Sequence, residues 1–168
     1  PQSTLFGKNA SAGVINIVTK KPSFERSGYV SSTLGNFNTK KVKSYITGPL
    51  NETTAYSLSA NVHQSDGHTD NLTTGSNVNN RDRFGFRGEL LFQPSDGLSI
   101  RVTADYDEYD EVCCAAGSTA YGVGNQIQSL MGGRIIPNNV FTQKVFYDFD
   151  PETKGDNSGL SMHIKKDF

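Results

Sequence analysis

Apolar and polar residues alternate along most of this chain, as in strands whose two faces meet different surroundings. The clearest run covers residues 98–107, where every second side chain is apolar and those between are polar or charged. Fainter runs predict further strands at 30–34, 42–46, 56–63, 83–93 and 160–165. Helical periodicity is hard to find, so the pattern predicts an all-β, antiparallel fold of about six strands. The faces of the first run are Leu98, Ile100, Val102, Ala104 and Tyr106 against Ser99, Arg101, Thr103, Asp105 and Asp107.

Short turns and long polar connections alternate between these strands. Gly35–Asn38 is a tight hairpin signal, 48–52 reads as a short turn, and Pro-Ser-Asp-Gly at 94–97 suits a type I turn. Long connections are expected at about 65–80 and about 110–157. Transmembrane barrels place short turns on one side and long loops on the other, and their strands need about 9–11 residues. The charged polar face would then line a hydrated lumen.

Two other architectures share this alternation. An antiparallel β-sandwich with a wet outer face gives the same pattern, and a small porin-like barrel is a weaker third reading. Membrane barrels need at least about eight strands, more than are visible here. Either further strands lie within the long connection or the chain is part of something larger.

The first 22 residues hold three short motifs in a fixed order. LFG stands at 5–7, the small-residue run ASAG at 10–13 and VINIVTK at 14–20, before Pro22. This order resembles the end of the plug domain of TonB-dependent outer-membrane receptors, and residues 81–116 resemble early barrel strands of that family. The family barrel has 22 strands around a plugged lumen. The resemblance implies the C-terminal end of a plug at 1–22 and an incomplete, N-terminal part of a transmembrane β-barrel at 23–168, so we expect a fragment of a longer receptor.

The resemblance also implies a function. Receptors of this family take up scarce nutrients actively across the bacterial outer membrane, and a ferric siderophore is the favoured ligand. The implied partners are outer-membrane lipid, the small-molecule ligand and the TonB complex, which would bind plug regions that this chain lacks. The alternative from another class is a soluble antiparallel β-sheet binding module, for example for carbohydrate.

Composition and motifs exclude several classes. The formal net charge of −1 leaves no basic excess for nucleic acid. No stretch approaches the length of an apolar membrane-spanning helix. Neither a hydrolase, metalloprotease or phosphate-binding motif nor a dinucleotide fingerprint occurs, so we expect no enzyme, no cofactor and no metal site.

Two sets of residues are candidates for ligand contact. By the resemblance, Phe6, Lys8 and Asn9 would belong to a plug loop that faces the ligand. The second set lies in an expected outer loop and consists of Asp110, Glu111, Cys113 and Cys114.

The outer-loop candidates have plainer readings. The adjacent cysteines form a vicinal disulfide that stiffens a ligand-contacting loop, contact a soft metal, or have only a local structural role. The acidic run at 105–111 lacks a calcium-loop spacing, so a solvated acidic rim is favoured over a cation site. The three histidines fit no metal motif and are read as lumen or loop residues. Four aromatic residues near strand ends are interpreted as a membrane-interface girdle: Phe84, Phe92, Tyr106 and Tyr109.

Overall fold

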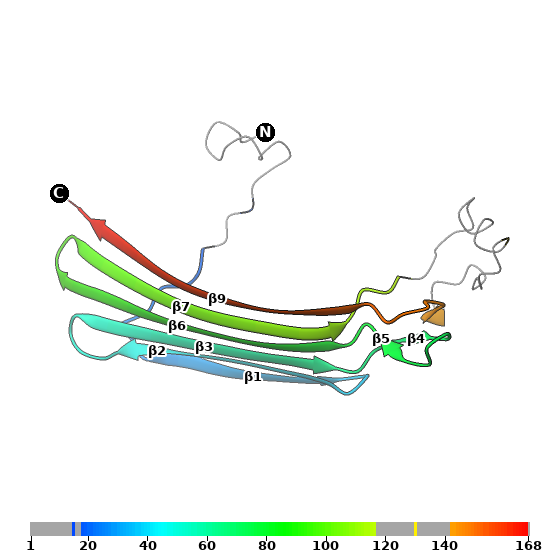
Figure 1. Ribbon diagram of the computed structural model, residues 1–168. Coiled ribbons are helices and arrows are strands. Elements are labelled where there is room, and N and C mark those ends of the chain that lie inside the picture. Colours follow the sequence, from blue (N-terminus) through cyan, green and yellow to red (C-terminus); the bar gives the residue numbers. More distant parts are fainter. Residues whose placement is uncertain (1–14, 16–17, 117–129, 131–141, 168) are drawn as a thin grey trace.

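The computed structural model describes residues 15, 18–116, 130 and 142–167. Its main feature is one curved, antiparallel sheet in which each strand pairs with its neighbours in chain order (Figure 1). The plug-loop candidates Phe6, Lys8 and Asn9 lie outside the described residues. The strands are β1 (Ser27–Gly35), β2 (Thr39–Pro49), β3 (Thr54–Ser65), β6 (Arg81–Ser95), β7 (Leu98–Val112) and β9 (Glu152–Lys166).

The six predicted strands are confirmed, and the later ones are longer than the pattern indicated. The first three have 9, 11 and 12 residues, and the last three have 15 each. Long loops join the strands at one end of the large sheet. The described N-terminal segment and the C-terminus lie toward the other end (Figure 1). In the described part of the chain, no helix is long and apolar enough to cross a membrane.

Residues with positive φ close two of the hairpin turns. Phe37 and Asn38 close the β1–β2 hairpin with φ of 56° and 53°, which confirms the predicted turn. At the β6–β7 hairpin the predicted short turn is present, but it is narrower than 94–97. β6 continues through Ser95 with a register shift after Phe92, and the chain reverses at Asp96 and Gly97 (φ +83°). The shift lies at Pro94, which has no backbone N–H to donate and is tolerated where a ladder is irregular.

The two long connections meet in a second, small sheet. β4 (Thr69–Asn71) pairs with β5 (Asn77–Val78) in the first connection and, in parallel, with β8 (Lys144–Val145) in the second. The second connection spans 113–151 and is shorter than expected, because β7 and β9 both extend into it. Val78, Ala115 and Val145 form a buried cluster here. Three loop-derived segments therefore pack as a small module at one end of the large sheet.

The register separates the large sheet into two chemically different faces. Residues paired across each ladder have the same parity, up to the shift after Phe92, so all even-numbered side chains share one face. The even face is apolar but exposed, whereas the odd face is polar. Large exposed apolar residues of the even face are Val30, Leu34, Val42, Ile46, Leu58, Phe84, Phe86, Leu90, Phe92, Tyr106, Leu160, Met162 and Ile164.

Candidate functional site

The exposed apolar side chains of the even face form a band, here called the apolar band. On β6 it runs from Phe84 to Phe92, about 26 Å at about 3.3 Å per residue. Leu160 is 79% exposed and Met162 66% exposed. Soluble monomers rarely expose continuous apolar patches of this size. Water is therefore not the expected neighbour of this face.

The apolar band crosses the sheet obliquely. On β1 it is centred near Ser32, which pairs with Val42 on β2. On β9 it is centred near Met162. The cross-strand pairs that start at Met162 lead through Val102 on β7 to Gly48 on β2. Across five strand spacings, about 24 Å, the band therefore slips by about six residues, about 20 Å, which is a slope of about 40°. Strands of transmembrane barrels tilt by about 35–45° from the membrane normal.

A polar rim ends the apolar band on the loop side. Lys40, Gln64 and Asp82 are cross-strand neighbours on the even face, and the Gln64 side-chain amide lies 3.4 Å from the Asp82 carboxylate. They line a polar hollow of about 220 Å³ with residues of the adjoining turns. The apolar-to-polar boundary runs across three strands, as expected where a hydrocarbon layer meets water.

The odd face is a ladder of charges. The Glu111 carboxylate, 1% exposed, accepts hydrogen bonds from the guanidinium groups of Arg81 and Arg83. The Arg87 guanidinium lies 2.9 Å from the Glu89 carboxylate and 3.9 Å from that of Asp105. Charged side chains that pair across neighbouring strands in this way suit a surface that contacts water.

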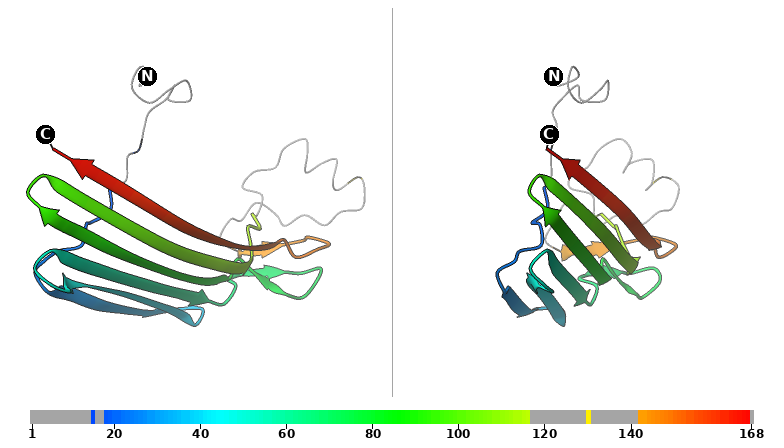
Figure 2. Two further views of the ribbon diagram at one scale, coloured as in Figure 1. Left: turned by 60° about the vertical axis from the view of Figure 1, so that its left-hand side comes forward. Right: turned by 90° about the vertical axis from the view of Figure 1, so that its left-hand side faces the viewer.

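Part of the odd face is buried beneath the segment that precedes β1. The backbone N–H of Ser23 donates to Thr47 Oγ1 at 2.9 Å, and that hydroxyl donates to the Tyr56 carbonyl. Residues 18–26 leave the start of β1 on the concave side of the sheet (Figures 1 and 2). The second carboxylate oxygen of Glu89 is buried without a partner in the described part of the chain. The segment is thus fastened to the polar wall.

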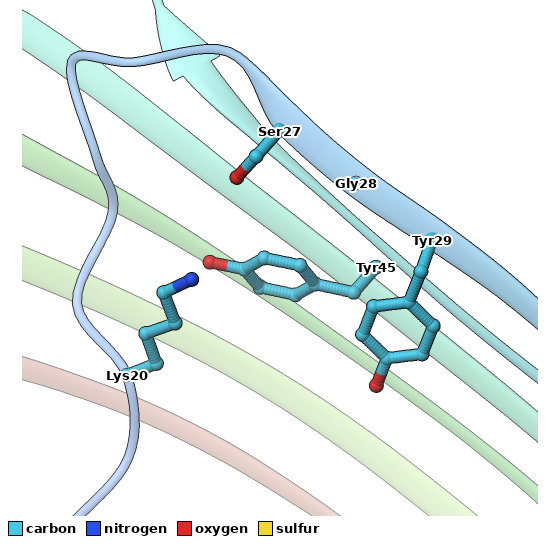
Figure 3. Close-up of a pocket in the computed structure, with 5 residues that line it drawn as sticks. All are labelled: Lys20, Ser27, Gly28, Tyr29 and Tyr45. Carbon is cyan, nitrogen blue, oxygen red and sulfur yellow. The ribbon is translucent and has the colours of Figure 1, made fainter.

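A hollow of about 340 Å³ lies between this segment and the first two strands (Figure 3). Lys20 Nζ lies 5.5 Å from the centre of the Tyr45 ring, a cation–π distance, and the Tyr29 and Tyr45 rings stack at 6.0 Å. Ser27 and Gly28 complete the lining. Gly28 is required, because a Cβ there would lie 2.7 Å from the Tyr45 carbonyl oxygen.

The two cysteines are bonded to each other at the start of the second long connection. The structure joins Cys113 and Cys114 in a vicinal disulfide across a cis peptide bond. Asn79 fixes the following residue, because its side chain donates to the Ala115 carbonyl and accepts from the Ala115 N–H, both at 2.9 Å. The disulfide therefore lies where one long connection is pinned to the other.

A carboxylate ties the small sheet together. The Asp150 side chain accepts hydrogen bonds from Asn71 Nδ2 at 3.0 Å, from Thr74 Oγ1 at 2.8 Å and from Ser76 Oγ. These donors hold the pKa of the Asp150 carboxyl below its usual value, with the Ser76 bond contributing most. We call this group the Asp150 latch. It joins residues more than seventy positions apart in the sequence.

The structure places the outer-loop candidates Asp110 and Glu111 within β7, on its opposite faces, and both carboxylates have partners. Asp110 pairs with Lys154 at 2.6 Å, and Glu111 pairs with two arginines. Asp107 accepts from the Asn157 amide at 3.0 Å. No group of three or more potential ligands that could hold a metal occurs among the described residues. The acidic run is a set of ion pairs and hydrogen bonds rather than a merely solvated rim.

The girdle interpretation is wrong for one residue. Phe84, Phe92 and Tyr106 belong to the even face, with Phe92 toward the short turns and the other two toward the loops. Tyr109 is on the odd face, opposite Gly155, where an added Cβ would lie 2.6 Å from its hydroxyl. Proximity to a strand end suggested the girdle, but residue parity decides the face.

Two histidines belong to the large sheet and one to a connection. His63 and His163 lie on the odd face of the large sheet, and His68 lies in a connection beside the Phe37 ring at 6.0 Å. None belongs to a possible metal group in the described part of the chain.

Comparisons with known proteins agree with the sequence resemblance. Over 77 residues the chain is 35% identical to the pesticin receptors of Yersinia enterocolitica and Yersinia pestis, which is 45% of this chain and 11% of each receptor. Over 105 residues it is 29% identical to the ferrioxamine receptor of Yersinia enterocolitica, 62% of this chain and 14% of that receptor. The chain is similar to bacterial receptors. No family model matches it.

These similarities support the resemblance to TonB-dependent receptors, and the relatives are receptors rather than enzymes. That agrees with the expectation that this chain is not part of an enzyme. The chain spans about 11% to 14% of the length of the curated relatives that it matches.

Sequence reasoning missed the most connected polar residues. Asn71, Asn79 and Asp150 bridge the two long connections, yet each stands in a polar stretch without a motif. Arg83 belongs to the same hairpin as Glu111, but counting outward from the Ser95–Leu98 pair would place it opposite Asp110. The register shift after Phe92 places it opposite Tyr109, on the same face as Glu111. The Asn71–Asp150 contact has no comparable local signal.

Proposed function

We propose that this chain is part of a TonB-dependent outer-membrane receptor. In this proposal the large sheet is an arc of the barrel wall, residues 1–22 are the end of the plug, and residues 23–168 are the N-terminal part of the barrel. The even face meets lipid, the odd face meets the lumen, and the small sheet lies outside the cell.

The oblique apolar band is the observation that carries the proposal. A soluble two-layer protein would cover this face with a second layer, whereas the band lies exposed on all six strands of the large sheet. Its slope of about 40° matches the strand tilt of transmembrane barrels. Among the strands that the structure describes, β1 and β9 each have one unpaired edge, and further strands of a larger barrel would pair with both.

The polar wall and its segment supply the receptor part of the proposal. Residues 18–26 leave the sheet on its concave, polar side, as a chain coming from a plug inside the barrel would. Ligand held by the plug and outer loops would trigger plug rearrangement, driven by the TonB complex. The transported nutrient in this proposal is a ferric siderophore, in keeping with the sequence relationship to a ferrioxamine receptor. Cys113 and Cys114 would form part of the outer ligand-facing surface, whereas Asp110 lies on the even face and the Glu111 carboxylate is buried against Arg81 and Arg83.

Uptake by the complete receptor tests this function. Cells that express it under iron limitation are expected to accumulate a radioactive ferric siderophore, and the protein is expected in the outer-membrane fraction. A strain without TonB, matched otherwise, is expected to bind the complex at the surface without accumulating it. Equal accumulation in both strains, or a receptor found in the soluble fraction, contradicts the proposal.

A further inference from the structure

The end of β7 is held to the first long connection on both sides of the cysteine pair, Cys113–Cys114. Before the pair, the Asn79 backbone N–H donates to the Val112 carbonyl at 2.6 Å. After the pair, the Asn79 side chain accepts from the Ala115 N–H and donates to the Ala115 carbonyl, both at 2.9 Å. We call these three bonds the Asn79 clamp. The cysteine pair lies between them, so it is the joint where β7 ends and the module of the small sheet begins.

The residues after the cysteine pair belong to the module of the small sheet. Ala115 packs with Val78 and Val145 in the buried cluster. Ala116 donates its N–H to the Tyr147 hydroxyl at 3.2 Å, and that hydroxyl donates to the Ala116 carbonyl at 3.0 Å. The direction in which the chain leaves the cysteine pair therefore decides whether these contacts form.

The two cysteines differ in their access to solvent. Cys113 is 7% exposed, whereas Cys114 is an exposed residue. Thiol–disulfide exchange begins when a thiolate reaches one sulfur of the bridge, and exposed disulfides are among the labile ones. The chain contains no further cysteine, so the attacking thiol must come from another molecule. The exposed side of the bridge directs that thiol to the sulfur of Cys114.

We propose that the cysteine pair is a thiol-reactive site, and that its reduction by a small external thiol releases the Asn79 clamp. The thiolate attacks Cys114 Sγ, the bond between the two protein sulfurs breaks, and the Cys113 sulfur leaves and takes up a proton. A second small thiol attacks the mixed disulfide, which frees the Cys114 thiol and forms the disulfide of the small thiol. The protein disulfide is reduced and the small thiol is oxidised, with two electrons transferred.

Reduction removes a covalent restraint from the joint. The bridge closes a ring that contains the peptide bond between the two cysteines, and this ring restricts their backbone torsions. Once the ring is open, the hydrogen bonds of Ala115 must also order two residues that have regained their freedom. The reduced clamp is therefore expected to open more often, whereas the ladder between β6 and β7 stays formed. The inference rests on the proposed function in one respect, because a module that lies outside the cell would meet thiols of the surroundings.

The test is backbone amide exchange of the complete receptor in lipid vesicles, with and without dithiothreitol. Alkylation followed by mass measurement verifies the oxidised and the reduced state of the cysteine pair. Exchange at the amides of Ala115 and Ala116 is expected to speed up about tenfold on reduction. Amides in the middle of β6 and β7 are the internal control and are expected to keep their protection.

Two variants separate the bridge from the clamp. Cys113→Ser/Cys114→Ser is expected to exchange at the fast rate at Ala115, with or without dithiothreitol. Asn79→Ala keeps the bridge but removes both side-chain bonds to Ala115, so it is expected to exchange at the fast rate in both redox states.

Cysteines that are free thiols in the receptor as isolated would overturn this inference. Exchange at Ala115 that does not change on verified reduction, or slow exchange in the double serine variant, would do the same. In each of these cases, TonB-dependent accumulation of a ferric complex would leave the proposed function standing. A receptor that shows the redox response but accumulates no ferric complex would contradict the proposed function alone.

Discussion

The two sheets of this protein treat apolar side chains in opposite ways. The small sheet has only two or three residues per strand, yet Val78 is fully buried and Val145 is 4% exposed. The large sheet has strands of up to 15 residues, yet Val30 on its even face is 77% exposed. None of the described apolar side chains on that face is as buried as Val78 or Val145. The small sheet obeys the rule for proteins in water, whereas the large sheet reverses it. The difference indicates that the small sheet and the even face of the large sheet are adapted to different surroundings.

A charge in the apolar band is the strongest way to break this comparison. Leu90→Arg places a guanidinium near the middle of the band on β6 and is expected to destabilise the membrane-inserted receptor by about 2–4 kcal/mol. Denaturant titration of the complete receptor in lipid vesicles measures the loss. Ser158→Arg, on the same face but beside Asp156 at the loop-side margin, is expected to cost about 0–1 kcal/mol. Equal costs at the two positions would mean that the even face does not contact lipid.

Truncation of the small core tests the other half of the comparison. Val78→Ala removes two methyl groups from a closely packed cluster and is expected to destabilise the small sheet by about 2 kcal/mol. Faster hydrogen exchange at the backbone amides of Asp70 and Asn71, which bond across this module, reports the local opening. Leu72→Ala, at a 45% exposed position in the same connection, is expected to stay within about 0.5 kcal/mol of the wild type. Exchange that is unchanged by Val78→Ala contradicts the buried-core description.

The Asp150 latch predicts a smaller, pH-dependent effect. Hydrogen bonds lower the pKa of the folded Asp150 carboxyl, so its stabilisation is present above the unfolded value of about 3.9 and is lost as the pH falls through the folded value. Amide exchange in residues 69–78 is therefore expected to rise, relative to intrinsic rates, on acidification below about pH 4. Asp150→Asn is expected to remove this dependence. A wild-type module whose protection is equal at pH 6 and pH 3 would contradict the latch.

The large sheet was readable from the sequence because its rules are local. Period-2 alternation indicates the face of each residue, and the turn signals at 35–38, 48–52 and 94–97 indicate which strands are neighbours. The errors arose where a second rule intervened. The register shift after Phe92 narrowed a turn, and Tyr109 was assigned by its place near a strand end when its odd number places it on the polar face.

The small sheet was not predictable for a physical reason. Its strands are too short to show a period, and the β4–β8 pairing joins residues about seventy positions apart. Asn71 and Asp150 have meaning only once those segments meet. The charge pairs lie between these extremes, since Glu111 and Arg83 belong to one hairpin but share a face only because the register shifts after Phe92.

Collision accessibility along β7 tests the central claim, a lipid-facing even face and a lumen-facing odd face, most directly. Single nitroxide labels at positions 100–105 of the complete receptor in lipid are measured against oxygen, which enters hydrocarbon, and against a water-soluble nickel complex. Labels at Ile100, Val102 and Ala104 are expected to favour oxygen, whereas labels at Arg101 and Asp105 favour nickel. Accessibility that does not alternate, or nickel access at the even positions, would contradict the account.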